Sequence, residues 1–537
     1  MRQSPTGSMR AGCGCGVRGT VSRLMKNIGE AARAKPRNGY AGSFLPLLDW
    51  RPMIKKDLRV TSSIFWYDYE TTGISPRCDR PLQVAGIRTN EALEEIDEPL
   101  NLYCRPADDI LPHPAACLVT GITPGILQER GLCEAEFITR LHQELALPGT
   151  CGAGYNNLRF DDEMTRYSLY RNFFDPYARE WQGGNSRWDL IDLVRTAYAL
   201  RPEGIEWPQE NGRVTLKLDR LTVANGLEHL HAHDALSDVR ATIALARLLR
   251  DRQPRLYDYL YQLRRKPAVL DQIELLKPLV HVSGRFSAER HYLAVVLPLA
   301  WHPLNRNALI VCDLQAEPAV LCDESAQTLR ERLYTRRDEL AAGALPVPLK
   351  LVHVNRCPVL APLSVLREGD LARLQLDLTQ CLQRARLLSE TRNTWLPKLG
   401  QIYQQETFEE CLDPEQQLYD GFLGDRDRRL CEQVRSLSAA ECAARSWPFD
   451  DPRLAELLFR YRARNFPETL SVAERERWAS FCRQRLIEAQ HGAPNTLQQF
   501  DEGLRQYAAT ATAAQTEVLE QWCSHVQQLR ERYAITD

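Results

Sequence analysis

The stretch SIFWYDYETTG, residues 63–73, ends an apolar, aromatic run with two carboxylates, Asp68 and Glu70, just before a turn. Aromatic and β-branched residues favour a strand, in which side chains two residues apart point to the same face. The stretch therefore predicts a strand that holds both carboxylates a few ångströms apart. Like charges at that distance repel each other, unless one carboxyl takes up a proton, both are fully solvated, or a cation lies between them.

Strands and helices alternate around this stretch, from about residue 60 to residue 250. The patterns predict further strands at 82–89, 102–107 and 150–156, and helices at 134–147, 161–174 and 234–252. This order is typical of an α/β domain with a mixed sheet.

The remainder of the chain divides into a β-rich part and a helical part. Residues 291–301, 307–314 and 348–354 favour strands, whereas Leu, Ala, Arg, Glu and Gln dominate from about residue 410, with a capping box from Ser471 to Glu474. We expect domains at 58–253, 254–405 and 406–537. Residues 1–57 are expected to be a disordered extension. Met53 resembles a natural start, so the part before it is interpreted as a start-site artefact.

The composition is that of a modular globular protein. At ~100–200 residues per domain, 537 residues predict three or four domains. The net charge of −2 means that any nucleic acid must be held by a local groove of Arg and Lys. The 16 cysteines include no Cys-x-x-Cys pair, which favours reduced thiols in a cytoplasmic protein. No run approaches the ~18 apolar residues of a membrane span, so no membrane insertion is expected.

Two later motifs offer partners for the first carboxylate pair. GYNNLRFDDE places Asp161 and Asp162 where a strand passes into a helix, and HAHDALSD places His233 five residues before Asp238 at the start of a helix. Taken singly, each motif has a plainer explanation, since an acid can cap a helix and a histidine can lie on the surface. Their order and joint content favour one acidic site.

These motifs resemble those of the DEDDh exonucleases of the RNase H-like superfamily, and more narrowly the bacterial exodeoxyribonuclease I family. The narrower resemblance rests on long strings such as SRWDLIDLVRTAYALRPEGIEWP, PLAWHPLNRNALIV and YRARNFPETL, and covers about residues 60–470. It implies an RNase H-like exonuclease domain with a mixed sheet, an SH3-like β-rich domain and a C-terminal helical domain.

The resemblance also implies 3′-to-5′ degradation of single-stranded DNA to 5′-mononucleotides, in DNA repair and recombination, by a monomer that binds the C-terminal tail of single-stranded-DNA-binding protein. Two Mg²⁺ ions, which Mn²⁺ can replace, would be held by Asp68, Glu70, Asp161 and Asp238. Asp68 would bridge both ions, and His233 would be the general base. A cation between Asp68 and Glu70 would then relieve their repulsion.

Contacts to the DNA strand are harder to predict. Within the matched motifs, Tyr69, Asn157 and Arg159 are candidates. The run RLYDYLYQLRRK, residues 255–266, interleaves basic residues with tyrosines and adds Tyr257, since such mixtures can contact phosphates and stack bases. An amphipathic helix between domains explains this run equally well.

Two other functions remain open. An RNA-directed DEDDh nuclease would use the same acids, although such enzymes usually resemble the first domain alone. A DNA-binding scaffold on an inactive nuclease domain is the other alternative, and the presence of all four acids and His233 argues against it.

Overall fold

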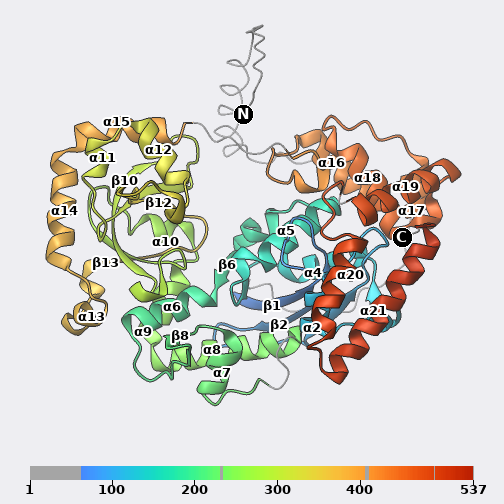
Figure 1. The fold of residues 1–537 in the computed structure, drawn as a ribbon, viewed down its shortest axis with the longest axis horizontal. Coiled ribbons are helices and arrows are strands. Elements are labelled where there is room, and N and C mark those ends of the chain that lie inside the picture. The colour runs from blue at the N-terminus through green and yellow to red at the C-terminus, as the bar shows by residue number, and fades with distance from the viewer. Residues whose placement is uncertain (1–61, 230–233, 405–410, 489, 536–537) are drawn as a thin grey trace, which may run out of the picture. The chain divides into compact units, whose positions relative to one another are not determined.

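The computed structural model describes residues 62–229, 234–404, 411–488 and 490–535 (Figure 1). The predicted disordered extension, 1–57, lies outside the described residues, and so does His233. The predicted mixed sheet, β-rich part and helical part are all present, in that order along the chain.

The first part of the chain builds a six-stranded mixed sheet in the order β4-β3-β2-β1-β5-β6. β1 pairs antiparallel with β2 and parallel with β5, as the predicted α/β domain requires. Its strands are β1 Ser63–Thr71, β2 Pro81–Thr89, β3 Leu100–Cys104, β4 Gly131–Leu132, β5 Thr150–Gly154 and β6 Ser186–Asp189, with a small hairpin of β7 Gln209–Glu210 and β8 Arg213–Val214. Its helices are α2 Pro114–Thr120, α3 Pro124–Arg130, α4 Glu134–Leu145, α5 Asp161–Arg171, α6 Leu190–Leu200, α7 Leu218–Ala224 and α8 Ala235–Arg252.

Alternation along β1 divides its side chains between two cores. Ile64 and Trp66 belong to the core that contains α6 and α8, whereas Phe65 and Tyr67 pack with residues of α4 and α5. A strand buried on both faces carries a nearly continuous apolar run, which is why its first five residues are all apolar or small. Because Asp68 and Glu70 share the parity of Ile64 and Trp66, they face the side that α8 covers.

The turn after β1 depends on a close backbone approach. Asp79 accepts hydrogen bonds from the Thr72 hydroxyl and from the Ser75 amide, both at 2.9 Å. A Cβ on Gly73 would lie 2.6 Å from the Asp79 carboxylate and 2.5 Å from His113, so a larger residue does not fit. The β1–β2 register shifts between Glu70 and Thr71, a bulge of the kind found beside active sites.

The second part contains the predicted β-rich module, a five-stranded antiparallel sheet in the order β12-β11-β10-β9-β13. Its strands are β9 Leu279–Val282, β10 Leu293–Trp301, β11 Ala308–Asp313, β12 Leu349–His353 and β13 Val359–Pro362. Helices precede, interrupt and follow this sheet: α9 Pro254–Gln262, α10 Lys266–Leu270, α11 Val320–Asp323, α12 Ala326–Tyr334, α13 Glu368–Arg373, α14 Leu378–Glu390 and α15 Arg392–Ile402.

The third part is helical, as predicted. Its helices are α16 Asp425–Ser436, α17 Ala439–Ala444, α18 Arg453–Asn465, α19 Val472–Glu488, α20 Leu497–Ala508 and α21 Ala513–Arg532. The predicted capping box is present, since the Ser471 amide donates to Glu474 at 2.8 Å and the Glu474 amide donates to the Ser471 hydroxyl at 3.3 Å. α20 and α21 pack on α2 of the first part (Figure 1).

A buried ion-pair network also joins the helical part to the first part. Arg80 donates to Glu415 at 2.5 Å, and Arg464 pairs with both Glu415 and Asp109, the latter at 2.8 Å. Arg485 approaches Asp109 at 3.1 Å. All five side chains are at most 6% exposed, so each depends on its partners for charge compensation.

Candidate active site

Asp68, Glu70 and Asp238 come together at the end of β1. Asp238 lies in the first turn of α8, and Val239 and Ile243 of that helix are buried in the same core as Trp66. One ligand atom from each of the three acids lies within 4.8 Å of the others. The fold therefore gathers into one cluster acids that are 170 residues apart in the sequence.

Asp161 is held against the same strand. It begins α5, is 4% exposed, and its Oδ1 accepts the backbone N–H of Tyr69 at 3.1 Å. Tyr69 lies between Asp68 and Glu70 in the chain, so this hydrogen bond anchors Asp161 beside the other acids.

The adjacent Asp162 has a different environment. It is fully buried and accepts from Tyr67 at 2.5 Å, from Arg179 at 2.8 Å and from Arg187 at 2.9 Å. Burial favours a raised pKa for Asp162, but Arg179 and Arg187 outweigh burial and hold the pKa below its usual range. The negative charge of Asp162 is therefore balanced by two arginines, and its role is structural.

Three of these acids, Asp68, Glu70 and Asp161, have raised pKa values. Burial, followed by the charges of Asp238 and Asp161, raises the pKa of Glu70 to about 9. Burial raises the pKa of Asp68 well above its usual range, with further contributions from Asp161, Glu70 and Asp238, and burial likewise raises the pKa of Asp161. Without a cation, Glu70 therefore keeps its proton at neutral pH.

One residue at this site was not predicted from the sequence. His229 lies in the segment between α7 and α8, and its Nε2 is 2.5 Å from Oδ1 of Asp238. The stretch LEHLHAHDALSD contains three histidines before Asp238. The sequence pattern did not show that His229 is the one that contacts Asp238.

The predicted strand contacts occupy different environments. Arg159 is exposed, whereas Asn157 is fully buried, and neither its Nδ2 nor its Oδ1 has a hydrogen-bond partner among the described residues. Tyr69 is 4% exposed and its hydroxyl bonds to Thr165 at 3.1 Å. Tyr257 is 3% exposed and its ring packs edge-on against Trp188, which matches the interpretation of α9 as an amphipathic helix between domains.

A groove of about 1280 Å³ runs between the first part, at Arg159, Glu163 and Asp189, and the β-rich module. Arg159 and Arg195 line it from the first part, and Lys350 and Arg356 line it from the β-rich module. Lys350 lies 5.5 Å from the centre of the Phe286 ring, which is only 9% exposed. The cationic side chains of the lining suit the phosphates of a single strand.

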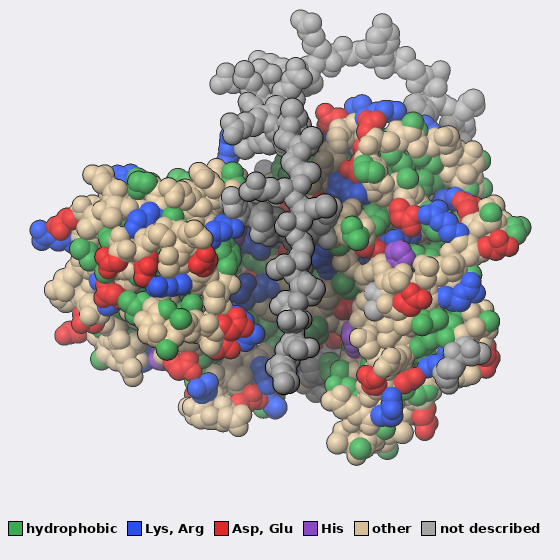
Figure 2. All heavy atoms as spheres, turned by 45° about the horizontal axis from the view of Figure 1, so that its top comes forward, with side chains coloured by type: hydrophobic (Ala, Val, Ile, Leu, Met, Phe, Trp, Pro, Cys, Tyr) green, Lys and Arg blue, Asp and Glu red, His purple; other side chains and the backbone are tan. Residues whose placement is uncertain are grey.

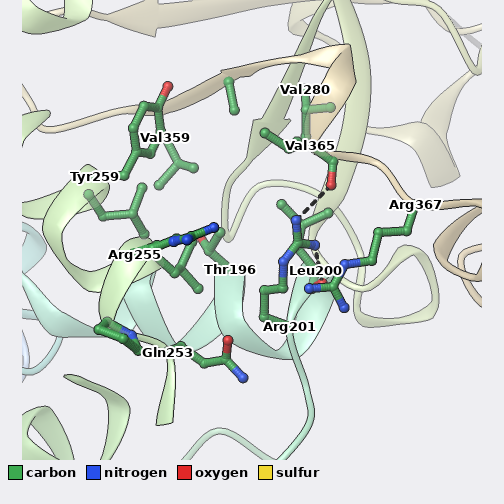
Figure 3. A pocket seen from close by; sticks show the side chains of 14 residues that line it. Thr196, Leu200, Arg201, Gln253, Arg255, Tyr259, Val280, Val359, Val365 and Arg367 are labelled. Carbon is green, nitrogen blue, oxygen red and sulfur yellow. Dashed lines mark hydrogen bonds between the residues drawn. The ribbon is translucent and has the colours of Figure 1, made fainter. Parts of the chain in front are cut away.

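A second cavity, of about 460 Å³, lies between α6, α9 and the edge of the β-rich sheet (Figure 3). Its walls are mainly apolar, and three arginines, Arg201, Arg255 and Arg367, line it. Arg201 donates to the carbonyl oxygen of Val365 at 2.9 Å and points toward Arg367 (Figure 3). An apolar hollow among arginines suits an acidic peptide with an apolar end.

Positive and negative side chains are interspersed over the described surface in Figure 2, as the net charge of −2 predicts. In the described part of the chain, no helix has the length and apolar character needed to cross a membrane.

Family models match three successive segments. The model described as "Exonuclease" matches residues 65–246, "Exonuclease I SH3-like domain" matches 264–405, and "Exonuclease I C-terminal domain" matches 412–529. The exodeoxyribonuclease I of Escherichia coli K12 is 48% identical over 431 residues, which cover 80% of this chain and 90% of that protein. The Haemophilus influenzae enzyme is 46% identical, with 79% and 90% covered.

Solved structures agree with the sequence matches. Exonuclease I from Methylocaldum szegediense has a TM-score of 0.83 at 48% identity, covering 87% of this chain and 99% of that chain. E. coli exonuclease I in complex with a dA16 oligonucleotide has a TM-score of 0.83 at 44% identity, covering 87% and 100%. A structure described as SSB/exonuclease I in complex with an inhibitor has a TM-score of 0.80 at 43% identity, with the same coverage. The ordered set of three domains, the acidic cluster and this degree of identity place the chain in the exonuclease I family.

Proposed function

We propose that this protein is a 3′-to-5′ exonuclease that hydrolyses single-stranded DNA to 5′-mononucleotides, acting in DNA repair and recombination. The convergence of Asp68, Glu70 and Asp238 within 4.8 Å, with Asp161 anchored beside them, carries the proposal. The groove lined by Arg159, Arg195 and Lys350 and the similarity to exonuclease I bound to an oligonucleotide support DNA as the substrate.

The acids fit divalent metal ions. All four offer carboxylate oxygens, which suit hard Mg²⁺ or Mn²⁺ better than Zn²⁺. The raised pKa values of Asp68 and Glu70 reflect burial and the charges of neighbouring acids, and bound cations would remove the repulsion. We infer that Mg²⁺ is the working ion, that Mn²⁺ substitutes for it, and that Asp68, Glu70, Asp161 and Asp238 hold two ions.

When bound, such ions would supply activation of the attacking water and stabilisation of the departing 3′ oxygen. The chain supplies the orientation: β1 presents Asp68 and Glu70 on one face, and the Tyr69 amide holds Asp161 in place. His233 is the proposed general base, because an imidazole with an ordinary pKa near 6.5 can take the proton of the attacking water and pass it to solvent.

The groove is the proposed path of the strand. Arg159 lies nearest the acids in the sequence, and Arg285, Lys350 and Arg356 continue the positive lining on the β-rich module. Asn157, whose buried amide has unmet hydrogen-bonding capacity among the described residues, is a candidate for contact with the terminal nucleotide. Base contacts by Tyr69 and Tyr257 remain predictions from the sequence, and both side chains are packed within the protein.

The arginine-lined cavity is the proposed site for the acidic C-terminal tail of single-stranded-DNA-binding protein. Arg201 and Arg367 can bind carboxylates, while Val280 and Val359 offer an apolar floor. The similarity to an SSB/exonuclease I structure supports this partner. Monomeric action and a cytoplasmic location remain predictions from the sequence.

One assay tests the catalytic proposal. The protein is incubated with 3′-labelled and 5′-labelled single strands of DNA and RNA, in Mg²⁺ or in chelator. We expect mononucleotides to be released from DNA 3′ ends only in Mg²⁺. Release from RNA alone would favour the RNA-directed alternative, and binding without cleavage would favour the scaffold.

A second assay tests the partner site. The variant R367E should lose binding to full-length single-stranded-DNA-binding protein while retaining DNA cleavage, because the cavity is separate from the acidic cluster. The partner with its tail deleted should bind neither the wild type nor the variant. Unchanged binding of the intact partner by R367E would contradict the assignment.

A further inference from the structure

We propose that His229 is a positioning residue for Asp238, and that it sets the affinity of the acidic cluster for divalent metal. This inference deepens the proposed function and rests on it. It concerns a histidine different from His233, the predicted general base.

His229 is clamped between two partners. Its Nε2 lies 2.5 Å from Oδ1 of Asp238, and its Nδ1 lies 3.1 Å from the hydroxyl of Thr222 in α7. A carboxylate can only accept hydrogen bonds, so Nε2 carries the proton and donates to Asp238. Nδ1 faces the Thr222 hydroxyl, so both ring nitrogens have a polar neighbour.

The second partner is itself rigid. Thr222 is completely buried, and its hydroxyl also lies 2.9 Å from the carbonyl oxygen of Leu218, one turn earlier in α7. α7 packs against α8, the helix that carries Asp238. The ring of His229 therefore connects two packed helices through one side chain from each.

The burial of His229 argues for positioning and against proton transfer. The side chain is 2% exposed, compared with 16% for Asp238, and both ring nitrogens are engaged. A general base has to release its proton to solvent in each cycle, and a ring enclosed in this way has no route for that release.

The position of Asp238 matters because its oxygens would complete the metal site. Glu70 and Asp68 offer oxygens within 4.8 Å of an Asp238 oxygen, so a rotation of Asp238 away from them would remove one ligand from the cluster. The hydrogen bond from His229 restricts this rotation and holds Asp238 in the arrangement that a cation can use. Loss of a hydrogen-bond partner of this kind typically weakens metal binding about 10–100-fold.

The test measures Mn²⁺ binding directly, by electron paramagnetic resonance of free Mn²⁺ titrated with full-length protein that has been freed of metal. We expect H229A to weaken Mn²⁺ binding about 10–100-fold. H229Q keeps an N–H donor on a side chain of similar reach and should recover much of that loss. H302Q is the matched control, because His302 is a buried histidine of the β-rich module, 4% exposed, whose Nδ1 accepts from the Asn305 amide at 3.0 Å. It should leave the Mn²⁺ affinity unchanged even if it lowers the melting temperature.

Activity provides a second reading. For H229A, kcat in limiting Mn²⁺ should fall and should recover as Mn²⁺ is raised, while affinity for single-stranded DNA in chelator stays at the wild-type value. If H229A and H229Q bind Mn²⁺ as the wild type does, the inference is wrong although the proposed function stands. If the wild type neither binds Mn²⁺ nor cleaves DNA, the proposed function itself fails.

Discussion

Two buried glutamates of this protein should respond in opposite ways to the same substitution. Glu70 is 8% exposed and lies among other acids, whereas Glu415 is 3% exposed and lies among arginines. We predict that E70Q stabilises the metal-free protein at neutral pH and that E415Q destabilises it.

The size of the first effect follows from the pKa of Glu70. In the unfolded chain this carboxyl ionises near pH 4.5, but in the folded protein it keeps its proton up to a pKa of about 9. Between these values the folded state binds more protons than the unfolded state, so the free energy of unfolding falls as pH rises. At about 1.4 kcal/mol per pH unit, the cost near pH 7.5 reaches about 4 kcal/mol. Because neighbouring acids contribute to this cost, E70Q should raise the free energy of unfolding by about 2–4 kcal/mol.

The second effect has the opposite sign. Burial favours a raised pKa for Glu415, but Arg464 and Arg80 outweigh burial and hold the pKa well below its usual range. The stabilisation from Glu415 is therefore present above about pH 4.5 and is lost as pH falls through the lower folded-state pKa. Removing one partner of a buried ion pair costs about 3–5 kcal/mol, and E415Q should lose a comparable amount.

Urea unfolding in chelator at several pH values between 6 and 9 measures both effects. The wild-type midpoint should fall with rising pH, E70Q should have a higher midpoint and a flatter pH dependence, and E415Q should have a lower midpoint throughout. Addition of Mg²⁺ should raise the wild-type midpoint more than that of E70Q, because metal binding stabilises the folded state. If E70Q were destabilised in chelator, the account of the acidic cluster as a repulsive, proton-holding site would be refuted.

Three further outcomes are expected. D68A should abolish cleavage in Mg²⁺ while leaving binding of single-stranded DNA in chelator intact, and retained cleavage would count against the metal site. H233A should slow the chemical step in a single-turnover assay with little change in DNA affinity, and a wild-type single-turnover rate would remove His233 from its role as base. R356A should weaken DNA binding. If the side chain contacts a phosphate, the negative slope of the log binding constant against log salt concentration should become shallower by about 1, as binding titrations at several salt concentrations would reveal.

Local sequence pattern was sufficient for much of the fold. The run Ser63–Thr71 could be predicted as a strand because its aromatic and β-branched residues favour extended backbone, and its period of two places Asp68 and Glu70 on one face whatever surrounds them. The capping box at Ser471 is also local, since its two hydrogen bonds span only three residues.

The roles of the tyrosines in α9 could not be predicted in the same way. Tyr257 and Tyr261 lie between basic residues at both ends of the run 255–266, but both rings pack against Trp188. A mixed aromatic and basic helix has the same sequence pattern whether its aromatic face meets DNA or a protein core, so the surrounding structure determines the outcome.

Prediction of the acidic cluster required both the sequence and the tertiary structure. Residue types and their order along the chain nominated Asp238, the pair on β1 and either Asp161 or Asp162, and the family resemblance selected Asp161. Folding supplies the physical difference between the two, because arginines 17 and 25 residues further along compensate Asp162, while Asp161 accepts the Tyr69 amide. The contact between His229 and Asp238 likewise depends on how α7 packs on α8, since a carboxylate's environment is set by atoms that are close in space and can be distant in sequence.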